Sequence, residues 1–246
     1  MKYETISLMI PTYRRPDKLK SIIDSAIKTA DNPTCLRFVF CVNKTDRLTS
    51  DFLDKLVMLQ GSRWEVVYEE TLQPNLALYF NKMYDETTFK DSIVSELGDD
   101  MVFVTPGWDT KILDEMNSHN GMAIVYFNDN YVAQEKCCVN LFTSREMVTA
   151  TKKPFMCPFF HADMIDMVWT MVGAMTGTLR YQPDFIIQHN HSTKEGSDEW
   201  DETFKRLVPV QKAANAQSNQ RLAIVYATLC AKNLIDSGFG KWNILN

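Results

Sequence analysis

The sequence predicts an α/β fold in which a mostly parallel central sheet is flanked by helices. Short apolar segments alternate with amphipathic segments from Ile6 to Leu97, and polar or acidic residues directly follow several of the apolar segments. Strands that alternate with helices in this way form parallel sheets that are covered on both faces. The chain has 246 residues, of which 45% are hydrophobic, so it is long enough to bury a sizeable core.

The first part of the chain contains four apolar segments that we expect to be buried strands, namely residues 6–10, 35–42, 64–68 and 93–97. Between them lie segments with apolar residues at helical spacing, which predict helices over residues 16–30, over residues 50–59 and from residue 74 onward. Pro16 suits the first turn of its helix, because the missing N–H is not needed there.

The second part is less regular. We expect further strands at residues 122–127, 139–143 and 185–187, and helices that start near residues 107, 145 and 161. Ser144 is placed to cap the second of these helices. The composition shifts at residue 193, which predicts a main domain over residues 1–192 and a helical extension over residues 193–246. The apolar residues of this extension indicate packing on the domain, a lid over the acceptor or a homodimer contact.

Composition and charge exclude several classes of protein. No apolar run approaches the roughly 20 residues of a membrane span. The first residues lack the apolar stretch of a secretory signal, so we expect a cytoplasmic protein. The net charge of −5 argues against a protein devoted to nucleic-acid backbones. The six cysteines show no CxxC spacing and are expected to be reduced thiols.

Three polar segments fall at the ends of predicted strands: residues 11–14, residues 43–46 and Asp99-Asp100. In open α/β sheets, ligands bind outside the carboxyl ends of the strands, so we expect these segments to share one site. Two adjacent carboxylates at the end of a buried strand are costly unless a cation meets them. A divalent metal or a bound substrate is therefore expected beside the acidic pair.

Several of these segments together resemble a GT-A glycosyltransferase of the family 2 type, similar to small bacterial and phage glycosyltransferases. Residues 7–19 resemble the opening strand and nucleotide-binding turn of that family, and Gly98-Asp99-Asp100 resembles its acidic metal-binding motif. His161-Ala162-Asp163 to Trp169 resembles the start of the helix that carries its catalytic base. The resemblance covers roughly residues 5 to 192 and implies a Rossmann-like GT-A fold.

Two departures from the family pattern limit the resemblance. Asn43-Lys44-Thr45-Asp46 stands where the family usually has an acidic pair, which puts the contact to uracil or ribose in doubt. The Gln-x-x-Arg-Trp motif is absent from the sequence, which argues against a processive polysaccharide synthase.

The resemblance implies a metal-dependent transfer of a sugar from a nucleotide-diphosphate sugar. Asp100 is expected to bind Mn²⁺ or Mg²⁺, hard cations that prefer oxygen ligands, and Asp99 to contact ribose or to support the metal ligands from behind. His191 is the first candidate to complete the metal site and His189 is the second, since a neutral imidazole is a reasonable ligand for Mn²⁺. Solvated loop acids are the alternative interpretation.

Asp163 is the first candidate for the base that takes the proton of the acceptor hydroxyl in an inverting reaction, and Asp166, one helical turn later, is the second. Asp163 could instead stabilise the start of its helix, and Asp166 could instead hold the acceptor. The nucleotide is expected to contact a group of residues around the first two strand ends, namely Pro11, Thr12, Tyr13, Arg14 and Asp46. Trp108 is expected either to contact the sugar or acceptor or to lie in the core.

The acceptor stays open at this stage. A saccharide is one alternative, and a hydroxymethylated base in phage DNA is another, which would have to leave the base stack. A sugar nucleotidyltransferase could share the same fold and acidic pair but would release pyrophosphate. A catalytically inactive module would bind sugar nucleotides without turnover.

Overall fold

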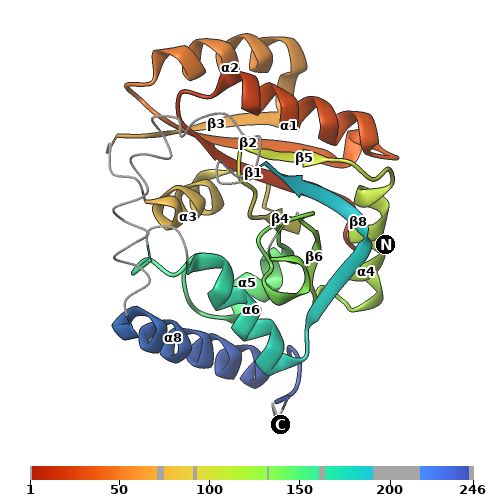
Figure 1. Ribbon diagram of the computed structural model, residues 1–246, viewed down its shortest axis with the longest axis vertical. Helices are drawn as coiled ribbons and strands as arrows, with labels where there is room; N and C mark the ends of the chain where they lie inside the picture. Colours follow the sequence, from red (N-terminus) through yellow and green to blue (C-terminus); the bar gives the residue numbers. More distant parts are fainter. Residues whose placement is uncertain are drawn as a thin grey trace.

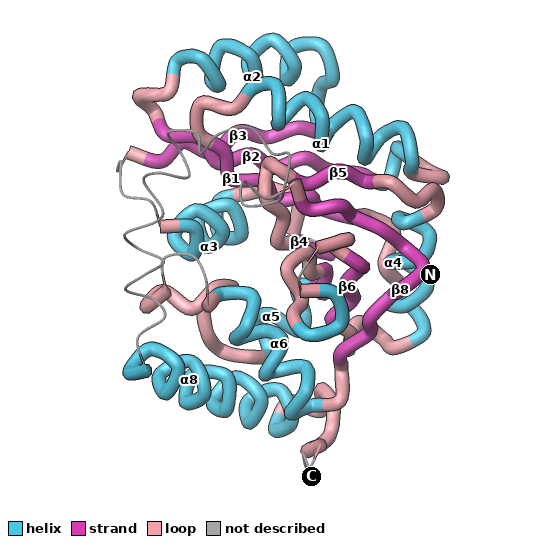
Figure 2. Tube along the Cα trace, viewed as in Figure 1, coloured by secondary structure: helices cyan, strands magenta, loops and turns pink. Residues whose placement is uncertain are grey.

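The computed structural model describes residues 2–70, 75–90, 93–131, 133–160, 164–190 and 217–243. Its centre is an eight-stranded sheet with the strand order β3-β2-β1-β4-β7-β6-β8-β5. The strands are β1 (Ile6–Thr12), β2 (Leu36–Asn43), β3 (Trp64–Glu69), β4 (Ile93–Ser95), β5 (Met101–Phe103), β6 (Ile124–Asn128), β7 (Phe142–Ser144) and β8 (Leu179–His189). Figure 2 shows how the strands curl from β3 at one end toward β8 and β6.

The sheet is mostly parallel, as the alternation of strands and helices predicted. Strands β3, β2, β1 and β4 are parallel neighbours, and β6 and β8 are also parallel. Strand β7 runs antiparallel to both of its neighbours, and β5 runs antiparallel to β8. The acidic pair Asp99-Asp100 lies in the turn between β4, an inner strand, and β5, which is the last strand in the sheet order.

Helices cover both faces of this sheet (Figure 1). They are α1 (Pro16–Thr29), α2 (Arg47–Gln60), α3 (Leu76–Glu86), α4 (Trp108–Ser118), α5 (Arg145–Ala150), α6 (Ile165–Thr176) and α8 (Gln217–Asp236). Short 3-10 turns lie at Pro33–Cys35, Gly61–Arg63 and Gln134–Lys136. Among the described residues, no helix combines the length and the apolar character that a membrane crossing requires.

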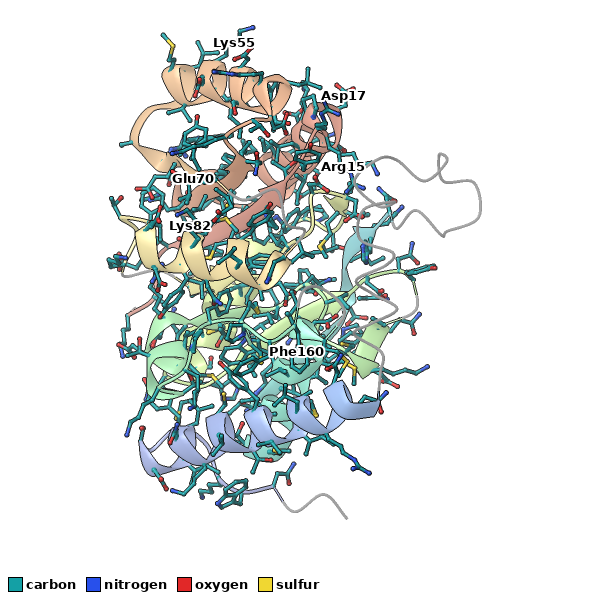
Figure 3. All side chains as sticks on the ribbon, turned by 90° about the vertical axis from the view of Figure 1, so that its left-hand side faces the viewer. Arg15, Asp17, Lys55, Glu70, Lys82 and Phe160 are labelled. Atoms are coloured by element: carbon teal, nitrogen blue, oxygen red, sulfur yellow. The ribbon has the colours of Figure 1, made fainter. Side chains whose placement is uncertain are left out.

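The two faces of the sheet carry separate hydrophobic cores. Apolar side chains of α1, α2 and α4 pack on one face, and those of α3, α5, α6 and α8 pack on the other. Along β1 the side chains alternate between the cores, because Met9 joins the second core while Leu8 and Ile10 join the first. Figure 3 shows Arg15 in the half that contains α1 and Phe160 in the half that contains α8.

Helix α8 belongs to the second core. Its buried side chains lie on one face, where it packs against α6, and they are Ala223, Tyr226, Ala227, Cys230, Ala231 and Leu234. The opposite face carries exposed Val225 and Leu229. The predicted domain boundary near residue 192 lies outside the described residues, as does the predicted helical segment before residue 217.

Several predicted element boundaries differ from the structure for identifiable reasons. Strand β8 was expected only at residues 185–187 but runs from Leu179 to His189. Pro183 interrupts its apolar pattern, yet the sheet accommodates it, because the pairing with β6 shifts register between Phe127 and Asn128. Strand β4 ends at Ser95, two residues earlier than expected, so Glu96 lies just beyond it. The predicted cap at Ser144 is confirmed, since its hydroxyl accepts from the Met147 N–H at 3.0 Å.

Candidate functional site

Polar side chains from distant parts of the chain meet where β1, β4, β5 and β8 end or begin. We call Thr12, Arg15, Asp99, Asp100 and His189 the strand-end cluster. Thr12 is the last residue of β1, and its hydroxyl donates to Asp99 Oδ2 at 2.8 Å. His189 is the last residue of β8 and pairs with Met101, the residue after Asp100. The strand order therefore brings the acidic pair to the end of β1 on one side and the end of β8 on the other.

Asp99 is buried, and each of its carboxylate oxygens contacts a neighbouring side chain. Arg15 Nη1 lies 2.9 Å from Asp99 Oδ1, and the two side chains are only 11% and 5% exposed. Burial raises the pKa of Asp99, and so does the charge of Asp100, whereas the guanidinium of Arg15 and the hydroxyl of Thr12 act in the opposite direction. Asp99 thus ties the first turn of α1 and the end of β1 to the acidic turn. This arrangement leaves Asp100 as the carboxylate of the pair that can meet a ligand.

Asp100 faces His189. The distance between Asp100 Oδ1 and His189 Nε2 is 3.4 Å. Burial alone would raise the pKa of Asp100, but the hydrogen bond and charge of His189 outweigh it and lower this pKa. Burial likewise opposes protonation of His189, but Asp100 and, more weakly, Asp129 and Asp166 raise its pKa above the ordinary value. Each of the two side chains therefore favours the charged form of the other.

The backbone holds Asp100 and His189 in place from both sides. The Asn190 N–H donates to the Asp100 carbonyl oxygen and the His189 N–H donates to the Asp129 carbonyl oxygen, each at 2.9 Å. Gly98 leaves room for the carboxylate, because a Cβ at this position would lie 2.6 Å from Asp100 Oδ1. The position of the Asp100 carboxylate thus depends on the absence of a side chain at residue 98.

The turn after β1 is held by Asp46. This residue is buried, accepts from the Arg14 N–H at 2.6 Å and caps α2 by accepting from the Thr49 N–H at 3.1 Å. Arg14 has a φ of 56°, a left-handed conformation that costs a non-glycine residue free energy and is kept only where the surroundings impose it. Its guanidinium lies 5.8 Å from the centre of the Tyr13 ring. Asp46 therefore fixes the segment that carries Pro11, Tyr13 and Arg14.

The sequence matches no known family model and no curated protein. The structure matches S. aureus TarS residues 1–349 with a TM-score of 0.60 and 11% identity, over 94% of this chain and 72% of that one. It also matches the mannosyltransferase PcManGT from Pyrobaculum calidifontis, in complex with GDP-Man and Mn²⁺, with a TM-score of 0.60 and 17% identity, over 96% of this chain and 76% of that one.

The chain has the GT-A glycosyltransferase fold. A further match is TarS 1–349 in complex with UDP-GlcNAc, with a TM-score of 0.58 and 10% identity, over 94% of this chain and 73% of that one. In a match to a longer TarS structure, this chain spans 43% of the TarS chain. At these identities the matches establish the fold alone, and the resemblance to a GT-A protein is confirmed at that level.

The strand-end cluster offers few side chains that can bind a divalent metal. Within the described ranges, no three His, Cys, Asp or Glu side chains are arranged to hold a metal ion. Asp100 and His189 supply one oxygen and one nitrogen ligand, while His191 lies outside the described residues. Two protein ligands suit a cation that takes its other ligands from substrate phosphates and water, as Mg²⁺ usually does. The residues present fit a metal that binds together with a diphosphate.

The two candidate bases differ in what can be said of them. Asp163, like His161, lies outside the described residues. Asp166 lies in the first turn of α6 and is half-buried, and its Oδ1 accepts from the Met167 N–H at 2.8 Å. Burial raises the pKa of Asp166, while hydrogen bonds and the charge of His189 oppose this.

Trp108 lies in the hydrophobic core. It is 1% exposed, its ring centre lies 4.3 Å from that of Phe103, and its indole N–H donates to the Ala26 carbonyl oxygen at 3.3 Å. A side chain in this position packs α4 against α1 and β5 and does not reach a ligand. Of the two alternatives for Trp108, the structure therefore favours the core.

Two residues of the region were missed by sequence reasoning. Arg15 was read with Arg14 as a single basic turn, and in the structure Arg15 forms an ion pair with Asp99. Its position one residue before the helix-starting Pro16 was the available signal. Glu96 was read as part of the acidic stretch without a role of its own, although it is buried just beyond β4. The acid at residue 129 proved to organise its own loop, since it accepts from the Ala133 and Gln134 N–H groups.

Proposed function

We propose that this protein is a glycosyltransferase that moves a sugar from a nucleotide-diphosphate sugar to an acceptor hydroxyl. The single observation that carries the proposal is the pair Asp100 and His189, which face each other at the ends of paired strands in a GT-A fold. The TarS and PcManGT structures carry UDP-GlcNAc and GDP-Man, which supports a nucleotide sugar as donor. By the same reasoning we assign the chain to the enzymes.

The turn after β1 would bind the nucleotide. Thr12 and the backbone of Pro11 end the strand, and Tyr13 and Arg14 follow in a conformation that Asp46 holds. The Tyr13 ring suits stacking on the base or ribose, and the Arg14 guanidinium suits the diphosphate, because it is a fixed positive charge with several donors. Asp99 contributes by holding Arg15 and Thr12 in place.

Asp100 and His189 would hold Mn²⁺ or Mg²⁺, with His191 as an alternative ligand. The Mn²⁺ in the PcManGT complex supports a divalent metal. When bound, the metal would neutralise the negative charge that develops on the diphosphate leaving group. Asp100 suits this role because its carboxylate is held by the backbone and by the space over Gly98.

A carboxylate near the start of α6 would serve as the base. Asp163 or Asp166 would take the proton of the acceptor hydroxyl while its oxygen attacks the anomeric carbon, which corresponds to inversion. The acceptor is a saccharide or a hydroxymethylated base in DNA. We further propose that the GT-A domain spans residues 1–192 and the helical extension residues 193–246, in a cytoplasmic protein that could pair through this extension.

Donor binding tests the proposal. A panel of sugar nucleotides with Mn²⁺ should raise the melting temperature, since a ligand at 100 times its Kd stabilises a protein by about 2.7 kcal/mol. For a chain of this length that corresponds to roughly 5–11 °C. The variant Asp100→Asn should lose the part of the shift that requires Mn²⁺, whereas the same substitution at the exposed Asp114 should not. If no sugar nucleotide shifts the melting temperature of the wild type, the proposal is wrong.

A further inference from the structure

The loop between β6 and β7, residues 129–141, begins beside the end of β8. Strand β6 runs parallel to β8, and their pairing extends to Asn128, the last residue of β6. The carbonyl oxygen of the next residue, Asp129, accepts the His189 N–H at 2.9 Å. The loop therefore starts next to the histidine of the strand-end cluster, although its side chains belong neither to that cluster nor to the turn after β1.

A buried carboxylate fixes the first half of this loop. Asp129 is 1% exposed, and its Oδ1 accepts from the Tyr131 N–H at 3.3 Å and from the Gln134 N–H at 2.8 Å. Its Oδ2 accepts from the Ala133 N–H at 3.1 Å. Asn130 and Gln134 have φ values of 50° and 43°, a left-handed conformation that such residues keep only where their surroundings impose it. Asp129 thus holds the loop in one defined shape.

The second half of the loop is tied to β6. The side chain of Asn140 is buried, accepts from the Phe127 N–H at 2.9 Å and donates to the Phe127 carbonyl oxygen at 3.3 Å. The hydroxyl of Tyr126 donates to the Glu135 carbonyl oxygen at 2.9 Å. Because buried polar groups hold the loop at several points, its side chains have preorganised positions, as the residues of a binding site require.

Tyr131 is an aromatic side chain that this loop holds against the strand-end cluster. The centre of its ring lies 6.5 Å from the centre of the His189 ring, and the two planes meet at 77°, which is an edge-to-face contact. His189 Nε2 in turn lies 3.4 Å from Asp100 Oδ1. Tyr131 is half-buried, so part of its surface is accessible. The ring is therefore separated from the Asp100 carboxylate by a single side chain.

The contacts of the cluster follow one another from the turn after β1 to this loop. Thr12, at the end of β1, donates to Asp99 at 2.8 Å, the neighbouring Asp100 faces His189, and His189 contacts Tyr131. In the sheet, β4 and β7 lie between β1 and β6. The base and the sugar of a nucleotide-diphosphate sugar likewise lie at opposite ends of the diphosphate. A donor with its base at the turn after β1 and its diphosphate at Asp100 directs its sugar toward Tyr131.

We propose that Tyr131 binds the sugar of the donor by packing its ring against the C–H groups of the sugar ring. This role rests on the proposed transferase function and assigns a residue of this chain to the group that is transferred. Sugar rings have apolar C–H faces, and aromatic side chains that line binding sites pack well against such surfaces. The aromatic ring makes this contact, so the Tyr131 hydroxyl is not required for it.

Titration calorimetry with matched ligands tests this role. With Mn²⁺ present, UDP-GlcNAc is compared with UDP, GDP-Man with GDP, and each further sugar nucleotide of the panel with its own nucleoside diphosphate. Tyr131→Ala should weaken binding of the sugar nucleotide by about fivefold to tenfold, because the packing of the ring on the sugar is lost. Its affinity for the nucleoside diphosphate should equal that of the wild type. Tyr131→Phe keeps the ring and should bind both ligands as the wild type does.

Tyr84→Ala is the matched control. Tyr84 is also half-buried, its ring centre lies 5.5 Å from that of Phe155, and its hydroxyl donates to the Arg145 carbonyl oxygen at 3.4 Å. Arg145 follows Ser144, which pairs with the first residue of β4, so Tyr84 lies at the opposite end of β4 from the acidic pair. This variant should bind both ligands as the wild type does.

The outcomes separate the two proposals. An unchanged affinity of Tyr131→Ala for the sugar nucleotide, or an equal loss for both ligands, would overturn the role of Tyr131 and leave the transferase function standing. An equal loss would mean that Tyr131 acts on the nucleotide or on the shape of the site. A wild type that binds no sugar nucleotide of the panel would refute the transferase function and the role of Tyr131 together.

Discussion

Replacing Arg15 by methionine should lower the free energy of unfolding substantially, because Arg15 is one member of a nearly buried ion pair. Arg15 and Asp99 are 11% and 5% exposed, so the substitution leaves a buried carboxylate without its positive partner. Removing one member of a buried pair typically costs about 3–5 kcal/mol. The Thr12 hydroxyl keeps one hydrogen bond to Asp99, so we expect the lower value, about 3 kcal/mol. For this length the melting temperature should fall by roughly 6–12 °C.

The loss should depend on pH in a defined direction. Burial raises the pKa of Asp99 and the guanidinium of Arg15 lowers it, so Arg15→Met should raise this pKa further. A raised folded pKa means that stability is lost as pH rises through it. The free energy difference between the wild type and Arg15→Met, measured by urea unfolding, should therefore be larger at pH 8 than at pH 5.

Two variants complete the measurement. Asp99→Asn added to Arg15→Met removes the unpaired charge and should restore most of the stability. Lys20→Met, in the same helix, breaks the exposed pair with Asp24 and should change the free energy of unfolding by no more than about 0.5 kcal/mol. A loss for Arg15→Met that is as small as that of Lys20→Met, or one that Asp99→Asn does not rescue, would refute the account of this pair.

Three further predictions concern individual residues of the site. Gly98→Ala should weaken donor binding with Mn²⁺ about tenfold or more while the protein stays folded, because the new Cβ displaces Asp100 Oδ1. Titration calorimetry measures the donor affinity and the melting temperature measures the stability. Unchanged donor affinity would show that the position of the Asp100 carboxylate is not important for binding. Asp46→Ala should cost about 1–3 kcal/mol in urea unfolding, because it removes the cap of α2 and the acceptor that holds Arg14 at positive φ. A loss below about 0.5 kcal/mol would contradict this. Trp108→Phe should lower the free energy of unfolding by about 1–2 kcal/mol, because the indole hydrogen bond and part of the packing are lost. The donor affinity should not change. A large loss of donor affinity at unchanged stability would instead indicate that Trp108 contacts the ligand.

The sequence predicted the central sheet well because its signal is local. Strand β1 contains a short apolar run that is followed by Pro11, and helix α1 starts at Pro16 and has apolar residues at helical spacing. The meeting of the first strand end with Asp99 also followed from sequence, since the carboxyl ends of parallel strands lie at one edge. The hydrogen bond from Thr12 to Asp99 realises this expectation.

The features that sequence reasoning did not predict depend on geometry that is not local. The meeting of Arg15 with Asp99 depends on the shape of the turn after β1, where Arg14 has a positive φ and its N–H donates to Asp46 from the loop after β2. The full length of β8 depends on the register shift that lets Pro183 lie in a strand.

The product of turnover tests the central claim most directly. Purified protein should be incubated with Mn²⁺ and the sugar nucleotide that raises its melting temperature most, and the release of nucleoside diphosphate and of pyrophosphate should be measured in parallel. A glycosyltransferase releases nucleoside diphosphate, and Asp100→Asn should lower that rate by about 100-fold or more. Release of pyrophosphate would indicate a nucleotidyltransferase instead, and binding without release of either product would indicate an inactive sugar-nucleotide-binding module.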